Sequence, residues 1–205
     1  MGLTREVEVR YLPAVLLFVL VAGNAGAQEI TSAYTELDSE GDCIIFDHQE
    51  GEDWSDLVCS GYKGYPVFLY YSDARETVFY GFPPQDGRPA WESFTSFNTA
   101  GPRIEWRIEK IDGREIPFAT IHRWFVTTDP EDSNGHTEVL VVNKVGQIGE
   151  WKGCVVGYVS ASGNADANDK ARQIADERAR DFNCGTDEPV AISGSVPLPD
   201  FRRSN

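Results

Sequence analysis

The chain has 205 residues and a formal net charge of −15, from 18 Lys and Arg against 33 Asp and Glu. Hydrophobic residues make up 41% of it and aromatic residues 12%, which is enough apolar material for a core and excludes wholesale disorder. The negative charge argues against binding to nucleic acid or to anionic lipid, because both need a basic surface. The length fits one domain.

The first 27 residues have the layout of a secretory signal peptide. Arg5 and Arg10 precede an apolar run at 12–22, and Ala-Gly-Ala at 25–27 forms a small-residue cleavage site. The run is too short for a membrane span, which needs roughly 20 residues. We predict cleavage before Gln28 and export to the periplasm or the extracellular space, with no membrane attachment afterwards. An uncleaved anchor is the alternative.

The segment that follows is strongly acidic, with ten Asp and Glu and no Lys or Arg between residues 28 and 62. We interpret it as a solvated loop, with two alternatives. One is a docking surface for a cationic partner, centred on Glu50, Glu52 and Asp53. The other is a calcium loop, which is the weakest hypothesis because Gln49 stands where an EF-hand loop has its glutamate.

Alternation of polar and apolar residues is clearest at 103–109, which places three apolar residues on one face and Arg103, Glu105 and Arg107 on the other. We interpret Glu105 as part of a structural cross-strand ladder rather than as a catalytic acid. Asp-Gly and Asn-Gly pairs further along favour tight hairpins. The predicted strands, an antiparallel meander, lie at 67–71, 77–82, 103–109, 115–127, 137–145 and 154–160.

Residues 82–102 contain four prolines, so we predict a long surface loop with one short turn near 90–94. Structureless connections of this length are uncommon and often functional. Trp91 and Phe94 are therefore candidate binding residues for a protein or a glycan, since aromatic side chains are enriched at such surfaces. The aromatic residues before this loop are interpreted mainly as core.

One helix is predicted after the last strand. Asn164 or Asp166 can cap it, and an alanine-rich stripe follows helical spacing as far as Phe182. Asp176 and Arg180 are spaced for an ion pair along the helix. Because the stripe is narrow and small, we expect the helix to lie close against the sheet.

The four cysteines are predicted to form structural disulfides. No pair has C-x-x-C spacing, and the intervals do not fit a zinc knuckle. Three pairings are possible, and we favour Cys43–Cys59 and Cys154–Cys184 because each closes a short loop.

No catalytic or metal site is recognisable. The three histidines are dispersed, with His48 in the acidic segment, His122 in the middle of a strand and His136 in a hairpin. The sequence has no H-E-x-x-H and no G-x-S-x-G motif. We therefore predict no catalytic residue, no metal and no cofactor.

Four blocks of sequence nevertheless resemble a known group of proteins. They are SAYT at 32–35, CSGYKGYPV at 59–67, GPRIEWR at 101–107 and PFATIHRW at 117–124. Together they resemble small secreted proteins of alphaproteobacteria, over nearly the whole chain after the leader. The resemblance implies a bacterial, periplasmic setting, and it carries over no activity and no catalytic residue.

These observations predict a signal peptide at 1–27, one disulfide-bonded α+β domain at 28–185 and a flexible tail at 186–205. The domain is expected to be an antiparallel sheet of six to eight strands with a C-terminal helix packed on it. The expected function is non-enzymatic binding of a cationic protein, peptide or envelope glycan. The alternatives are a periplasmic hydrolase acting on an envelope polymer, and a structural or stress-protective domain without a ligand.

Overall fold

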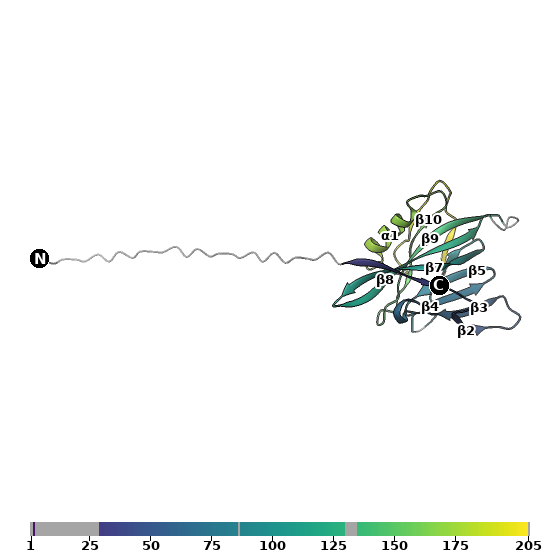
Figure 1. The fold of residues 1–205 in the computed structure, drawn as a ribbon, viewed down its shortest axis with the longest axis horizontal. Coiled ribbons are helices and arrows are strands. Elements are labelled where there is room, and N and C mark those ends of the chain that lie inside the picture. The colour runs from purple at the N-terminus through teal and green to yellow at the C-terminus, as the bar shows by residue number, and fades with distance from the viewer. Residues whose placement is uncertain (1, 3–28, 86, 130–134, 205) are drawn as a thin grey trace.

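The computed structural model describes residues 2, 29–85, 87–129 and 135–204 (Figure 1). The predicted signal peptide and its cleavage point lie outside the described residues. In these ranges no helix combines the length and apolar character that a membrane crossing requires. The elements are β1 (Ile30–Glu36), β2 (Cys43–His48), β3 (Trp54–Cys59), a 3-10 turn η1 (Tyr62–Gly64), β4 (Val67–Ser72), β5 (Arg75–Tyr80), β6 (Trp91–Phe94), β7 (Asn98–Ile111), β8 (Arg114–Thr127), β9 (His136–Lys144), β10 (Cys154–Ser160), α1 (Ala167–Arg178), β11 (Val190–Ile192) and β12 (Phe201–Ser204).

The predicted fold class is confirmed: antiparallel strands dominate, and α1 packs on them (Figure 1). The strands divide into a six-stranded sheet in the order β1-β7-β8-β9-β10-β11, a four-stranded sheet in the order β2-β3-β4-β5, and the pair β12-β6. Neighbours are antiparallel except β10 and β11, which are parallel. The consecutive hairpins β7-β8-β9-β10 are the predicted meander.

The six-stranded sheet is the middle of three layers. One of its faces packs against the four-stranded sheet, in a core centred on Trp106, Tyr80 and Trp124. Its other face packs against α1, where Ala171 and Ala175 are fully buried, as the narrow alanine stripe predicts. A sheet covered on both faces is rigid, and it leaves the four-stranded sheet as an outer layer with one face of its own to present.

The acidic segment is not the loop that we predicted. It forms β1, which pairs with β7 along its whole length, and the hairpin β2–β3. The strand pattern is hard to detect because polar and charged residues occupy exposed positions of both strands, and because a bulge after Ile45 shifts the register.

The long loop at 82–102 is also shorter than predicted, since β6 and the first residues of β7 lie within it. The backbone of Glu92 is held by the Thr77 hydroxyl, which accepts from its N–H at 3.1 Å and donates to its C=O at 2.9 Å. Pro102 is tolerated because the β7–β8 register shifts between Ala100 and Ile104, where no regular ladder is required.

The expected flexible tail contributes two strands, β11 and β12. Phe201 packs on Phe94 and Tyr158, with ring centroids 5.3 and 5.0 Å apart. Arg203 forms an ion pair with the buried carboxylate of Glu92 and donates to the carbonyl of Val155 at 3.1 Å. This part of the chain is therefore built into the core and is corrected from tail to structural element.

Both predicted disulfides, Cys43–Cys59 and Cys154–Cys184, are present, and no described cysteine is free. Disulfides of this kind are typical of proteins that fold in an oxidising compartment. The first joins residues directly opposite each other on β2 and β3, so it fixes the edge strand to its neighbour.

We expect removal of Cys154–Cys184 by a double Cys→Ala substitution to lower the free energy of unfolding by somewhat under 4 kcal/mol. The same change at Cys43–Cys59 should lower it by about 3 kcal/mol, because Cys43–Cys59 closes the shorter loop. Urea titration of the oxidised variants measures both values. Equal or inverted losses would contradict the loop-length argument.

We expect Arg203→Ala to lower the free energy of unfolding by about 3 kcal/mol, because it leaves the Glu92 carboxylate buried without its cation. A second change, Glu92→Gln, removes that charge and should recover part of the loss. Additive losses in this double-mutant cycle would show that the two side chains do not depend on each other.

Candidate functional site

The most exposed apolar surface of the described residues lies on β2. Ile44, Ile45 and Phe46 are 70%, 56% and 51% exposed, and they are consecutive. The strand is the edge of its sheet and, in the part of the chain that the structure describes, pairs with β3 alone. An exposed apolar edge strand presents free backbone donors and acceptors together with apolar side chains, which is the arrangement that a second strand can extend.

The predicted docking residues frame this strand. Glu50, Glu52 and Asp53 are exposed in the turn that joins β2 to β3. Asp42 precedes the strand and is also exposed, and Asp47 lies on it. The apolar edge is thus surrounded by negative charge, and the predicted acidic surface and the exposed apolar residues belong to one hairpin.

Arg88 brings a cation to this hairpin from the segment before β6. Its guanidinium pairs with Asp47 at 3.1 Å and forms a closer ion pair with Asp56. The side chain of Asp56 is only 3% exposed, whereas that of Arg88 is 60% exposed. Burial raises the pKa of Asp56. The positive charge of Arg88 lowers this pKa, and the negative charge of Asp47 raises it. The net shift of the Asp56 pKa is upward.

Aromatic rings surround the Arg88 ion pairs. The guanidinium lies 5.7 Å from the ring centroid of Trp54 and 6.0 Å from that of Tyr70, which is cation–π geometry. Phe46 meets Phe68 and Tyr70 edge to face, with centroids 6.0 and 6.5 Å apart. The outer face of the four-stranded sheet is therefore aromatic and carries fixed carboxylates.

Trp91 borders this face, as a binding residue would. It lines a groove of about 350 Å³ together with Tyr70, Thr77 and Arg88. Arg88 links the two features, because it borders the same groove as Trp91 and pairs with Asp47 on β2. Phe94 is different. It is 1% exposed and packs on Trp124 and Phe201, so it is a core residue and is corrected from binding candidate to structural anchor.

His122 is fully buried and both of its ring nitrogens have partners. The carbonyl oxygen of Gly101, 2.6 Å from Nε2, can only accept, so Nε2 carries the proton and Nδ1 accepts from the Tyr80 hydroxyl at 2.7 Å. Burial lowers the pKa of His122 to about 4. The imidazole is a neutral bridge between the two sheets, with no lone pair left for a substrate.

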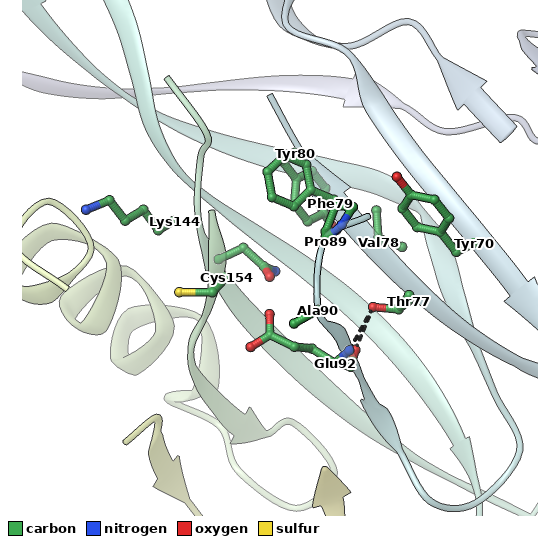
Figure 2. Close-up of a pocket in the computed structure, with 11 residues that line it drawn as sticks. Tyr70, Thr77, Val78, Phe79, Tyr80, Pro89, Ala90, Glu92, Lys144 and Cys154 are labelled. Carbon is green, nitrogen blue, oxygen red and sulfur yellow. Dashed lines mark hydrogen bonds between the residues drawn. The ribbon is translucent and has the colours of Figure 1, made fainter. Parts of the chain in front are cut away.

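Glu92 is the most deeply held carboxylate near a cavity (Figure 2). Burial raises its pKa, and Arg203 and the N–H of Val155, which donates at 2.7 Å, oppose the rise. Figure 2 shows its carboxylate directed toward the strand that carries Cys154. The cavity holds about 10 Å³, which is room for one water at most.

Glu105 lies between β7 and α1. It accepts from Arg172 at 2.8 Å and from Ser32 at 2.6 Å. Burial raises its pKa, but the bonds to Arg172 and Ser32 outweigh this and hold the pKa below its ordinary value. It is a structural carboxylate, as predicted: its nearest cation is Arg172 from the helix, and Arg107 on the same strand lies 3.7 Å away.

The remaining polar candidates lie apart. His48 and His136 are exposed, at the end of β2 and the start of β9. Asp38 is the residue at which the alternative calcium loop would begin. Its carboxylate instead accepts hydrogen bonds from the backbone N–H groups of Glu40 and Gly41 at 3.1 and 2.9 Å, as in an Asx turn. Within the described ranges, no group of three or more His, Cys, Asp or Glu is placed to hold a metal ion.

Sequence reasoning singled out the acidic turn and Trp91 as candidates, and it did not single out the apolar edge or Arg88. A signal for the edge was present, since three consecutive apolar residues between carboxylates are unusual for a solvated loop. No local signal could link Arg88 to Asp56, because the two are distant along the chain and meet only through the sheet.

The His122 bridge makes stability sensitive to acid. Its pKa is about 4 in the folded chain and near 6.5 when unfolded, so the unfolded state binds the extra proton between these values and stability falls as pH is lowered from 6.5 toward 4. We expect His122→Gln to remove about 1.4 kcal/mol of this dependence per pH unit. Urea unfolding at a series of pH values tests this, and parallel profiles for both proteins would contradict it.

Comparison of the chain with family models, with curated proteins and with solved structures found no match.

Proposed function

We propose that this protein is an exported binding module that recognises a cationic protein or peptide through the β2–β3 hairpin. The observation that carries the proposal is the exposed run Ile44-Ile45-Phe46 on an edge strand, within a segment of ten acidic residues and no basic one. Apolar exposure of this kind marks an interaction site, and the surrounding charge defines which partners approach it.

Strand addition is the mode of binding that the geometry favours. The outer edge of β2 has no strand neighbour among the described residues, so an extended segment can hydrogen-bond to it while its side chains alternate between the two faces. Cys43–Cys59 keeps the edge in place before the partner arrives, which lowers the entropy cost of binding.

Charge selects a cationic partner over a second copy of this chain. Pairing of two β2 edges would bring two acidic hairpins together, and Glu50, Glu52 and Asp53 of each copy would repel those of the other. Basic side chains flanking an extended segment would instead meet carboxylates along the whole strand. Trp91 and the aromatic sheet face offer the same partner stacking contacts.

Two buried titratable groups that a hydrolase could use are engaged in structural contacts. His122 bridges Tyr80 and Gly101, and Glu92 is bound by Arg203 beside a cavity of about 10 Å³. These contacts support a binding module ahead of a hydrolase acting on an envelope polymer. A periplasmic location, which the leader and the alphaproteobacterial resemblance favour, would give the module access to cationic envelope proteins.

Neutralisation of the acidic turn tests the proposal. We expect the variant Glu50→Gln/Glu52→Gln/Asp53→Asn to bind a deca-arginine peptide at least tenfold more weakly in calorimetry, and wild-type affinity to fall steeply between about 0.05 and about 0.3 M salt. The control Asp169→Asn/Glu177→Gln/Asp181→Asn makes the same charge change on exposed residues at α1 and just beyond its end. Equal losses in both variants would reduce the effect to net charge and contradict the hairpin site.

The apolar edge is tested separately with Ile44→Thr/Ile45→Thr, which keeps strand propensity and removes apolar surface. We expect weaker binding of an extended basic peptide with alternating valine and lysine, and a smaller loss for deca-arginine.

A further inference from the structure

We propose that Arg88 fills a cation cage on the four-stranded sheet, and that an arginine or lysine side chain of the partner takes its place in the complex. The inference rests on the proposed function and names the point at which the cationic partner is recognised. The bound guanidinium of Arg88 is itself the observation that identifies the ligand class.

The cage has two kinds of wall. Asp47 and Asp56 supply carboxylates that pair with the guanidinium, and Trp54 and Tyr70 supply rings 5.7 and 6.0 Å from it. Carboxylates combined with aromatic faces form the usual environment for a recognised ammonium or guanidinium group. Three of these four residues lie on paired positions of β3 and β4 or at their ends, so sheet pairing fixes their relative positions.

The carboxylate of Asp56 is fixed in the sheet, whereas the cation that pairs with it can be exchanged. Asp56 lies in a central strand with its side chain 3% exposed, and apart from Arg88 its Oδ2 atom has no partner among the described residues. Arg88 comes from a segment without regular secondary structure, and its side chain is 60% exposed. A buried carboxylate needs a cation at all times, but the need is met equally by a cation from another molecule.

Space for an incoming side chain adjoins the cage. The groove of about 350 Å³ is bordered by Arg88, Tyr70 and Trp91, so it adjoins one of the two rings near the guanidinium, that of Tyr70. Tyr70, Thr77, Pro89 and Ala90, which border this groove, also line the small cavity of Figure 2, so the groove floor is continuous with the core. If Arg88 is displaced, the position that it leaves therefore stays open for another side chain.

Occupation by Arg88 makes recognition selective. A single free cation gains little by replacing it, since one cation–carboxylate pair is exchanged for another. A basic segment that also pairs with the β2 edge holds its side chain next to the cage at high effective concentration, and can compete. The apparent affinity is the intrinsic affinity multiplied by the fraction of molecules in which Arg88 has left the cage.

Arg88→Ala tests this on the full mature protein. We expect it to bind deca-arginine roughly three- to tenfold more tightly than wild type in calorimetry, because the internal competitor is gone. Arg75→Ala is the matched control, since Arg75 lies on the same sheet, pairs only with the exposed Asp73 among its recorded ion pairs, and carries the same charge. Methylguanidinium should compete with the peptide for Arg88→Ala and raise its melting temperature.

The outcomes separate the two proposals. Tighter binding by Arg88→Ala than by Arg75→Ala, lost again when Asp56→Asn is added, supports the cage. Equal affinities of the two single variants overturn the cage and leave the hairpin site standing. No binding by wild type or by any variant overturns the proposed function and this inference together. If Arg88→Ala does not fold, Arg88→Gln provides the same comparison with the side-chain volume kept.

Discussion

Neutralisation of buried charge is the constraint on which this fold depends. The charged face of β7 can be covered only because α1 and the residues just after it bring opposite charges: Arg107 pairs with Asp176 on α1, and Glu109 with Arg180 beyond its end. Because such pairs gain little over apolar contacts but cost much when one partner is lost, they tie helix and sheet to a single arrangement. The same rule holds at Glu92 and at Asp56, each of which has an arginine from a distant segment.

The location of the proposed binding surface follows from the layers. Among the described residues the middle sheet is covered on both faces, whereas the four-stranded sheet combines an open edge with an aromatic outer face. Its inner face supplies Tyr80 and Val67 to the core, which anchors it without using the outer face. The residues proposed to meet a partner are nevertheless partly buried: Asp56 and Tyr70 are 2% and 8% exposed, and Asp56 depends on Arg88 for its cation.

Sequence patterns predicted the features that depend on residues close together in the chain. Alternation at 103–109, the Asp-Gly turn and both disulfides were confirmed, because each depends on residues near one another in the chain. The strands β2 and β12 were missed because their charges satisfy partners elsewhere in the fold. The expected Asp176–Arg180 pair is likewise replaced by contacts with β7. Asp176 accepts from Arg107, and Arg180 donates to Glu109. Phe94 was misplaced because prolines around it resemble a surface loop.

The pairing of Glu92 with Arg203 has a consequence for the time at which the protein can fold. The two residues are 111 positions apart, and a chain leaves a ribosome or a secretion channel with its N-terminal part first. Until residue 203 has emerged, Glu92 cannot be buried as a carboxylate with its cation, and β6 lacks the strand that pairs with it. The part of the fold around β6 is therefore completed only after residue 203 has been delivered, however early Glu92 itself emerges.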